Sequence, residues 1–599
     1  MPSYKAPLQD INFLLKDVFD ATSHYATLDN CPEITEDVID AIINEAAKFA
    51  EQVVGPLNAV GDAEGCQFND GKVTTPTGFK DAYQQYVDNG WVGLGCPEEF
   101  GGQNMPPSLG SVVSEMIGGS NWAWSMYPGL SNAGIECIGA HGSEEQKQTY
   151  LHHLVKGSWT GSMCLTEPHC GSDVGLIKTK AIANADGSYS MTGTKIFISG
   201  GDHDMADNII HMVLARVEGA PEGTKGISLF IVPKFIVNED GTLGERNTVN
   251  AGSIEHKMGC NGSATCVMNF DGAKAFIVGE ENSGLQQMFT MMNTARIGTA
   301  LQGMCIGNNS YQGAVEYAKE RLQMRSLSGP KNEKGPADPI IVHPDVRRML
   351  LTQKSLIEGS RALVYWLNQE NDKSQFAKTD EERETAEAIL GMLTPLAKGF
   401  CTEVGNEVSA IGIQVYGGHG FIREHGMEQH ARDNRISTIW EGTTGIQALD
   451  LIGRKVLGSG GELLRGVTKI IHKYCEANKD DALLAPFVES LAARNKEWGE
   501  VTMTVGAAAM ENPDEVGAAS VDYLMFGGYV ILGYLWSKMA QISQAKIDAG
   551  DNNPLYFSKV HTAKFYFDRI MPRTNVHLQA MKTGSANLMD IQEEHFIIS

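Results

Sequence analysis

The feature that most constrains the fold is a change of hydrophobic period near residue 158, which reverses near residue 281. Before it, apolar residues recur at three- and four-residue spacing, as in Ile34–Val54, and this spacing predicts helices. Between the two positions, β-rich runs such as Tyr189–Ser199 and Asn208–Val217 alternate with turn signals. The pattern predicts a mainly α protein with a central antiparallel β-barrel or sandwich, which is unlike the βαβ alternation of a Rossmann fold.

The same pattern predicts the domain organisation. A chain of 599 residues exceeds what one hydrophobic core usually organises. Ser143 followed by Gln146 predicts a capped helix start, and the Pro, Gly and charge content of Leu327–Pro339 predicts an irregular loop. The glycine-rich Leu457–Glu462 is a candidate linker. The expected parts are an N-terminal extension (1–33), an N-terminal α-domain (34–157), a β-barrel domain (158–280), a helical bundle domain (281–456) and a C-terminal helical domain (463–599).

Membrane insertion and metal binding have little support in the sequence. The longest apolar run, Tyr523–Trp536, contains two glycines and is interpreted as a buried helix. The N-terminus lacks the features of a secretory signal, so a cytoplasmic location is expected. The eleven cysteines show neither a CxxC pair nor Cys/His ligand spacing, which argues for reduced thiols and for no metal site.

The net charge argues against nucleic acid as a partner. Lys and Arg number 48 against 73 Asp and Glu, a balance of −25. Such a field repels phosphate backbones unless a basic patch is segregated, and no basic run is present. A small anionic ligand can still bind through a few local donors, because the distant net charge is screened.

Three short stretches are candidates for chemistry, although each has an ordinary structural explanation. Neither GxGxxG after a strand nor GxxxxGK[ST] is present, so the common phosphate loops are absent. Met163–Asp173 offers hydroxyls and backbone N–H groups for a polar ring edge or a phosphate, or it is an ordinary turn. Gln414–Gly420 places three glycines within four residues, which indicates a close backbone approach or a helix-ending turn. Glu441, in "TIWEGTT", is a candidate catalytic carboxylate or a residue that favours a helix start.

In combination and in this order, the motifs resemble those of the acyl-CoA dehydrogenase family. The resemblance runs from about Ile34 to Lys455, and the short N-terminal extension and extra C-terminal domain are similar to the large bacterial branch of the family. The matching stretches are "GCPEEFGG" (95–102), "MCLTEPHCGSD" (163–173), "GTKIFISGG" (193–201), "KMGCNGS" (257–263), "TARIGTALQGMCIG" (294–307), "QVYGGHG" (414–420) and "IWEGTTGIQ" (439–447).

The resemblance implies a reaction, a cofactor and partners. The implied reaction is the FAD-dependent α,β-dehydrogenation of acyl-CoA thioesters, of fatty acyl-CoA or 3-methylmercaptopropionyl-CoA type, to trans-2-enoyl-CoA in β-oxidation. Electrons would pass to an electron-transfer flavoprotein, and the protein would be a homodimer. Glu441 would be the base that removes the α-proton, because desolvation raises a carboxylate pKa of about 4.3 toward the working range.

Other roles follow from the resemblance position by position. Phe197 and Ser199 would pack on the flavin face, and Arg296 would lie close to the CoA arm unless it is a structural ion-pair residue. Ser172, Arg296 and Gly442 are the predicted substrate contacts. The predicted FAD contacts are Met163, Leu165, Thr166, Gly171, Ser172, Phe197, Ser199, Arg321, Gln323, Gln414, Val415, Gly417, Gly418 and Thr443, those from Arg321 to Gly418 across a subunit interface.

The sequence departs from the family pattern at a few positions. Phe197 stands where Trp is common, and His169 and Cys170 stand where Gly-Ala is usual. Some members place the base near Arg296, but Ala295 offers no carboxylate there, which strengthens the assignment of Glu441. Acyl length depends on the packing of residues such as those in 116–134 and 288–292, and the sequence does not fix it.

Two other functions remain as alternatives. A relative of the same fold is a DNA-associated alkylation-response flavoprotein, but that function predicts a basic C-terminal face, which the acidic balance disfavours. A flavin-bound scaffold without turnover would be favoured by loss of the base, and Glu441 is present.

Overall fold

A computed structural model describes residues 3–597 of the chain and divides them into two compact units. We call residues 3–6 and 40–295 the barrel unit, and residues 7–39 and 296–597 the bundle unit. Two helices, α3 (Glu36–Phe49) and α9 (Gly284–Glu320), run from one unit into the other. The mainly helical fold with a central barrel, predicted from the hydrophobic period, is confirmed.

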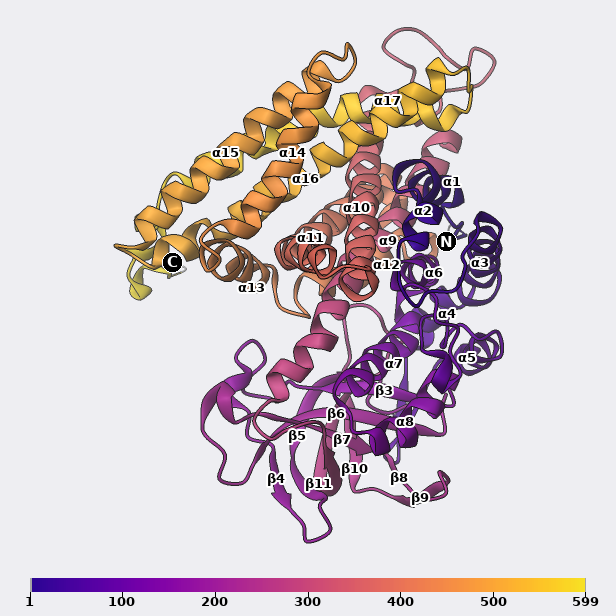
Figure 1. Cartoon of the computed structure of the whole chain (residues 1–599). Helices are drawn as coiled ribbons and strands as arrows, with labels where there is room; N and C mark the ends of the chain where they lie inside the picture. The colour runs from indigo at the N-terminus through magenta and orange to yellow at the C-terminus, as the bar shows by residue number, and fades with distance from the viewer. Residues whose placement is uncertain (1–2, 598–599) are drawn as a thin grey trace. The chain divides into compact units, whose positions relative to one another are not determined.

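The barrel unit contains a closed barrel, whose strands gather at the lower end of the view in Figure 1. The strands pair in the circuit β11–β5–β4–β6–β7–β11, and β10 and β3 extend it at β11 and β6. Closure leaves the five strands of the circuit no free edge, whereas β10 and β3 each pair on one side only. The strands are β3 (Trp159–Cys164), β4 (Lys180–Ala183), β5 (Tyr189–Ser199), β6 (Asn208–Val217), β7 (Ser228–Pro233), β10 (Val249–Ile254) and β11 (Thr265–Ile277), with the small hairpins β1 (Gln67–Asn69) with β2 (Lys72–Thr74) and β8 (Phe235–Val237) with β9 (Leu243–Arg246).

The barrel is not purely antiparallel, so that part of the expectation is wrong. β3 pairs with β6 in parallel, and β4 does so too. The connectivity explains the second pair, because β5 turns back along β4 as a hairpin and β6 then returns on the other side of β4. A sequence in which β-rich runs are separated by turn signals predicts antiparallel pairing only between strands that a short turn joins.

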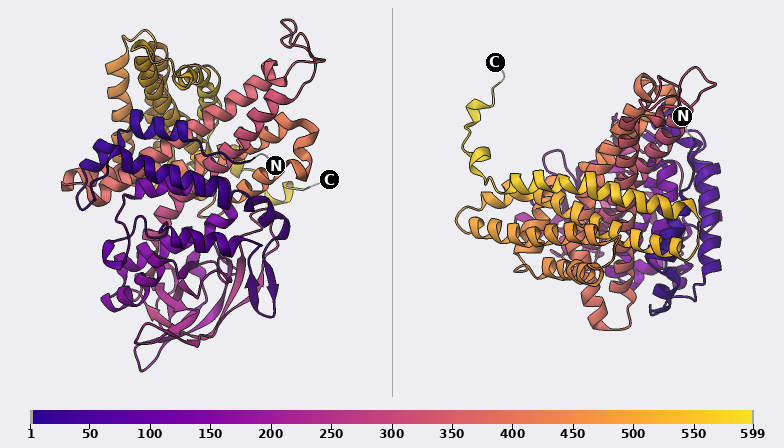
Figure 2. Two further views of the ribbon diagram at one scale, coloured as in Figure 1. Left: turned by 90° about the vertical axis from the view of Figure 1, so that its right-hand side faces the viewer. Right: turned by 90° about the horizontal axis from the view of Figure 1, so that it is seen from above.

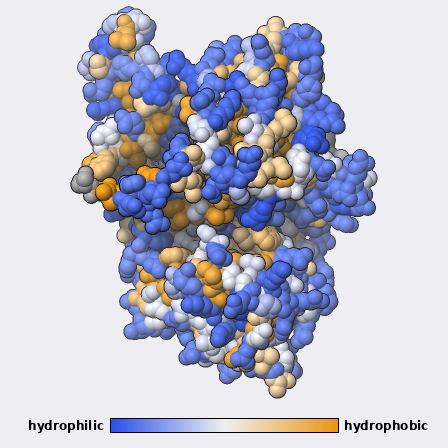
Figure 3. All heavy atoms as spheres, turned by 90° about the vertical axis from the view of Figure 1, so that its left-hand side faces the viewer, coloured by the Kyte–Doolittle hydropathy of each residue, from blue (hydrophilic) through white to orange (hydrophobic). Residues whose placement is uncertain are grey.

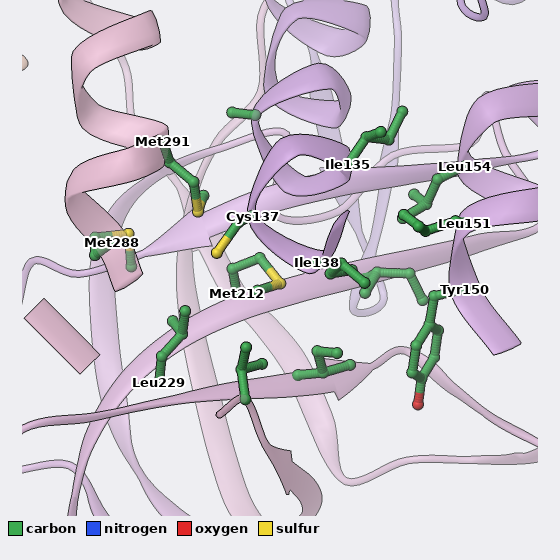
Figure 4. Close-up of a cluster of buried hydrophobic side chains, with 14 of the residues drawn as sticks. Ile135, Cys137, Ile138, Tyr150, Leu151, Leu154, Met212, Leu229, Met288 and Met291 are labelled. Carbon is green, nitrogen blue, oxygen red and sulfur yellow. The ribbon is translucent and has the colours of Figure 1, made fainter. Parts of the chain in front are cut away.

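Helices pack on the barrel through a buried apolar cluster. Figure 4 shows Cys137 and Ile138 of α7, Leu151 of α8, Met212 of β6 and Met288 of α9 in this cluster, all between 0% and 2% exposed. The capping box predicted at the start of α8 is confirmed, with Ser143 and Gln146 exchanging hydrogen bonds. The helices of this unit are α4 (Leu57–Glu64), α5 (Phe79–Asp88), α6 (Pro107–Ser120), α7 (Trp122–His141) and α8 (Glu144–Lys156), together with most of α3 and the start of α9.

The bundle unit is mainly helical, with an irregular loop at Leu327–Pro339, and includes the C-terminal helices. Neighbouring pairs such as α10 with α11 and α15 with α16 pack side by side (Figures 1 and 2). The Leu457–Glu462 stretch lies inside this unit, so the boundary drawn there stays a prediction. The α-helices are α1 (Leu8–Asn12), α2 (Ala21–Ala26), α10 (Pro344–Phe376), α11 (Asp380–Tyr416), α12 (Met427–Arg435), α13 (Thr444–Leu449), α14 (Glu462–Asn478), α15 (Ala485–Ala509), α16 (Asp514–Asp548), α17 (Pro554–Phe565), α18 (Thr574–Met581) and α19 (Ala586–Met589), with most of α9.

Helices α9 and α11 cross closely at two glycines. A Cβ on Gly303 would lie 2.4 Å from the carbonyl oxygen of Cys401, and one on Gly405 would lie 2.2 Å from that of Gly303. Side chains at either position would force the helices apart. Because the contact between Ser310 and Gly412 has the same sequence offset as that between Gly303 and Gly405, the two helices run in parallel. The same offset pairs Arg296 with Lys398, so both cations lie at one level of the bundle.

The apolar run Tyr523–Trp536 lies within α16, and the prediction of a buried helix is confirmed. By length and composition α16 is apolar enough to cross a membrane, but 67% of its most apolar window is buried in the protein, as in a core helix. On the face drawn in Figure 3, hydrophobic and hydrophilic side chains are interleaved. All eleven cysteines carry free thiols, as expected.

A buried charge cluster ties the N-terminal extension to the C-terminal helices within the bundle unit. Asp10 of α1 binds Arg361 of α10 and Lys559 of α17, and Lys559 also contacts Glu358 at 2.8 Å. Burial raises the pKa of Asp10, but the two cations outweigh that effect and lower it to about 2. Each charge therefore has a partner, which buried charges require.

Candidate active site

The residues predicted from the sequence fall into two groups, one in each unit. Met163 to Ser199 belong to the barrel unit, and Arg296 to Thr443 belong to the bundle unit. The two groups are described separately below.

In the barrel unit, Phe197 stands on a β-bulge next to the end of β3. The register between β5 and β11 shifts between the pairs Lys195–Met268 and Ile198–Cys266, so two residues of β5 face one of β11. Phe197 has a φ of 59°, and the residue is 59% exposed. The backbone N–H of Ile196 donates to the carbonyl of Thr166 at 2.9 Å. The fold therefore brings an exposed aromatic ring beside the Thr166 loop, as the prediction for both residues requires.

A buried ion pair fixes this arrangement. The Lys195 ammonium donates to the Leu165 carbonyl and to Glu167 Oε1, both at 2.9 Å. The Glu167 carboxylate also accepts bonds from the N–H groups of Lys178 and Thr179, at 2.7 and 3.0 Å. Burial raises the pKa of Glu167, but Lys195 and these donors outweigh it and lower the pKa. The pair joins the end of β3 to β5.

The loop after Glu167 carries the two residues that depart from the family pattern. Glu167, His169 and Cys170 bring a carboxylate, an imidazole and a thiol within 4.8 Å of one another. The carboxylate is already neutralised by Lys195, so it is a poor ligand for a second cation. Gly171 and Ser172 are exposed, while Met163, Leu165, Thr166 and Ser199 are partly buried.

In the bundle unit, the ends of α9 and α11 are joined by aromatic stacking. Tyr317 stacks on Tyr416 with ring centroids 4.0 Å apart, and its hydroxyl lies 2.8 Å from His419 Nδ1. Helix α11 ends at Tyr416, so the predicted helix-ending turn is confirmed. Arg321, Gln323, Gln414, Gly417 and Gly418 are exposed at this end, whereas the Val415 side chain is 5% exposed and packs in an apolar cluster. Val415 can therefore offer only its backbone to a ligand.

Glu441 lies in a left-handed turn that precedes α13. Its φ is 54°, and that of Gly442 is 84°. The Thr443 hydroxyl accepts a bond from the N–H of Ile446 at 3.3 Å and so caps α13. The Gln447 amide donates to the Glu441 carbonyl at 2.8 Å, and the Lys398 ammonium donates to the Gly442 carbonyl at 2.6 Å.

Burial and nearby charges shift the pKa of the Glu441 carboxyl group. Burial raises its pKa, and Lys398 and Arg296 partly offset that rise. Burial lowers the pKa of Lys398 to about 8, while Glu441 and Glu403 act in the opposite direction. A carboxylate with a raised pKa is suited to accept a proton near neutral pH.

Arg296 is held by an ion pair. Its Nη1 lies 3.2 Å from Asp450 Oδ2, and the residue is 6% exposed. Arg454 Nε binds the other oxygen of Asp450 at 3.2 Å. This geometry favours the structural alternative that was open for Arg296, and direct contact with substrate stays a prediction.

Backbone strain marks two of the predicted site residues independently of sequence motifs. Within residues 3–597, nine residues other than glycine have positive φ, and five of these are Asn or Asp, which tolerate it. The other four are Phe197, Cys260, Met324 and Glu441. Such strain persists only where surrounding structure enforces it and is concentrated at functional sites.

For the flavin chemistry that the resemblance implies, Gly442→Ala is expected to slow flavin reduction by acyl-CoA about 10-fold. A Cβ at Gly442 would lie 2.7 Å from Gln447 Nε2, at a φ of 84° that costs an L-residue about 1 to 2 kcal/mol. Gly445→Ala is the matched control, because its Cβ meets nothing closer than 3.9 Å and lies in α13. Stopped-flow reduction of both variants measures the effect; equal rates would contradict the importance of this turn.

Comparison with known proteins identifies the family to which this chain belongs. Family models match as follows: acyl-CoA dehydrogenase N-terminal domain (37–158), middle domain (162–273) and C-terminal domain (282–457), and acetyl-CoA dehydrogenase C-terminal like (467–592). A 3-methylmercaptopropionyl-CoA dehydrogenase of Ruegeria pomeroyi is 38% identical over 98% of this chain and 99% of its own. The chain belongs to the acyl-CoA dehydrogenase family.

Other relatives of this acyl-CoA dehydrogenase family enzyme extend the comparison. The broad-specificity linear acyl-CoA dehydrogenase FadE5 of Mycobacterium tuberculosis is 34% identical over 94% of this chain and 95% of its own. An acyl-CoA dehydrogenase of Bacillus anthracis, solved in complex with FAD, has the same fold, with a TM-score of 0.74, 21% identity, and coverage of 92% of this chain and 89% of that one.

The structure adds supporting residues to which sequence reasoning gave no role. Glu167 and Lys195 lie inside motifs that were singled out, and Lys398 and Gln447 lie in helices around the Glu441 turn. One signal was available for Lys398, which stands in the apolar stretch "LTPLAKGF" of a predicted helix, where a charged residue needs a buried partner.

Proposed function

We propose that this enzyme is an FAD-dependent dehydrogenase that converts acyl-CoA thioesters to trans-2-enoyl-CoA, with Glu441 as the base. The observation that carries the proposal is the left-handed turn that holds the half-buried Glu441 carboxylate, whose pKa burial raises, beside two cations. Family membership gives the reaction class, and the turn supplies a group able to begin it.

The chain's residues fit FAD in two places. The exposed Phe197 side chain, with the Thr166 loop bonded to the preceding residue of β5, offers a flat face and a polar edge for an isoalloxazine ring, and Met163 is a further proposed contact. At the end of α11, Gly418 has nothing within 4 Å of its Cβ position, and Arg321 is exposed, as binding of a pyrophosphate requires. Leu165, Gly171, Ser172, Ser199, Gln323, Gln414, Val415, Gly417 and Thr443 complete the proposed contacts. When bound, FAD supplies the acceptor for the hydrogen that leaves the β-carbon with its electron pair.

Glu441 removes the proton from the α-carbon in this proposal. The α-proton of a thioester is weakly acidic, and negative charge moves to the thioester oxygen as the proton leaves. The backbone N–H of Glu441 is the proposed donor that stabilises this oxygen, because a donor fixed before the reaction needs no reorganisation during it. Gly442 and Ser172 are proposed to contact the substrate, with Arg296 near its CoA part.

The substrate and partners are proposed from relatives. We assign the substrate to the fatty acyl-CoA or 3-methylmercaptopropionyl-CoA class, since relatives that cover nearly the whole chain are named for 3-methylmercaptopropionyl-CoA and for linear acyl-CoA. An electron-transfer flavoprotein is the proposed acceptor, a homodimer the proposed assembly, and the cytoplasm the proposed location.

Anaerobic mixing of the purified yellow protein with acyl-CoAs tests the proposal. Thioesters of increasing length, and 3-methylmercaptopropionyl-CoA, are added while visible flavin absorbance is recorded. Bleaching by one length class is the expected result and defines the substrate range. A fully flavinated protein that no thioester bleaches would overturn the proposal and favour the DNA-associated or scaffold alternative.

A further inference from the structure

Two buried side chains donate hydrogen bonds to the two backbone carbonyls of the Glu441–Gly442 turn. Lys398 Nζ donates to the Gly442 carbonyl at 2.6 Å, and Gln447 Nε2 donates to the Glu441 carbonyl at 2.8 Å. Lys398 and Gln447 are both 0% exposed. They come from different helices, since Lys398 lies in α11 and Gln447 in α13.

We propose that Lys398 and Gln447 are positioning residues that clamp the Glu441–Gly442 turn, and that the Lys398 ammonium is also the counter-charge of the Glu441 carboxylate. The inference rests on the proposed function in one respect, which is the role of Glu441 as base.

The clamp has a clear physical need. The turn precedes α13, so neither of these part-buried carbonyls bonds within a strand or helix, and leaving one without a donor costs up to about 1 to 3 kcal/mol. Glu441 has a positive φ, which a residue with a side chain keeps only where the surrounding structure enforces it. The orientation of the Gln447 amide follows from its partner, because a carbonyl oxygen accepts only from the NH₂ group.

The Lys398 ammonium binds the carbonyl of Gly442, the residue directly after Glu441, and this position is why we assign Glu441 as its counter-charge. The charged groups that act on Lys398 are Glu441, Glu403 and Arg296. Glu403 already accepts a 2.6 Å bond from the Thr444 hydroxyl, and Arg296 is paired with Asp450. Lys398 and Arg296 both lower the pKa of Glu441, so loss of the Lys398 charge raises that pKa further. The ionised base then requires a higher pH.

The test compares Lys398→Met and Lys398→Arg with the unmodified chain, all loaded with FAD. A water-soluble carbodiimide attacks protonated carboxyls, so the pH at which Glu441 labelling falls by half, measured by peptide mass spectrometry, reports the Glu441 pKa without turnover. In Lys398→Met we expect this midpoint to rise by about one pH unit, since one nearby opposite charge is lost. In Lys398→Arg the charge remains, and the midpoint should stay within a few tenths of a unit.

Gln447→Leu separates clamping from charge. It removes a donor without changing the number of charges, so we expect kcat for acyl-CoA reduction of the flavin to fall about 10-fold with an unchanged labelling midpoint. FAD content and thermal unfolding of each variant identify loss of fold.

The outcomes separate this inference from the proposed function. A wild-type chain that no thioester bleaches would end the proposed function, while the labelling midpoints still decide the role of Lys398. A folded, flavinated Lys398→Met chain with an unchanged midpoint would overturn the counter-charge. An unchanged kcat in Gln447→Leu would overturn the clamp.

Discussion

Replacing Glu441 with glutamine is expected to lower the rate of flavin reduction by acyl-CoA by about 100- to 10,000-fold, the contribution of one positioned general base. The amide matches the carboxylate in size and leaves the left-handed turn and its bonds from Lys398 and Gln447 in place. FAD content should therefore stay unchanged. Stopped-flow reduction at saturating thioester measures the rate, and a variant that keeps most of the wild-type rate would exclude Glu441 as the base.

The pH dependence gives a second readout for the same residue. Because burial raises the pKa of Glu441, the carboxylate is lost as pH falls through that raised value, and the rate falls with it. Above that pKa, ionisation of Glu441 causes no further change in the rate. Glu441→Gln should lose this acid limb, whereas Glu441→Asp, which keeps a carboxylate one methylene shorter, should be slower but retain it.

Much of the fold could be predicted from the hydrophobic period. A strand or helix that buries one face has apolar residues at the spacing of that element. β5 and β6 begin and end where the predicted β-rich runs do, and the α8 cap uses the two predicted residues. The parallel pairing of β4 with β6 was missed, since order around a barrel depends on contacts between segments far apart in the chain and leaves no local pattern.

The candidate site was accessible to sequence reasoning only through its motifs. The left-handed conformations of Phe197 and Glu441 have no signature in residue type, because neither residue favours positive φ. The bond from Lys398 to Gly442 joins positions 44 residues apart in the sequence, so no local pattern reveals it. Such supporting contacts arise from the packing of α11 against the segment around α13, which the sequence alone does not specify.

Lys195→Met is expected to cost the barrel about 3 to 5 kcal/mol of local stability, the usual effect of removing one partner of a buried ion pair. The Lys195 and Glu167 side chains are 0% and 3% exposed, so the variant leaves a buried carboxylate without its cation. The bond from Lys195 to the Leu165 carbonyl is lost as well, and the Thr166 loop is no longer fastened to β5 at that point. Hydrogen exchange of β3 and β5 peptides should accelerate, and FAD should dissociate more readily.

The control is an exposed ion pair on the same barrel, between Lys274 of β11 and Asp186, 3.1 Å apart with side chains 41% and 56% exposed. Lys274→Met should leave β5 protection unchanged, because water solvates the remaining charge. In the double variant Lys195→Met/Glu167→Gln no bare charge is left, so it should be more stable than Lys195→Met. Since Lys195 lowers the pKa of Glu167, the pair's stabilisation is present above the usual pKa of a glutamate and is lost as pH falls through the lowered value. Unchanged β5 protection in Lys195→Met at neutral pH would show that hydrogen bonds from Lys178 and Thr179 alone hold the loop that we assign to the flavin.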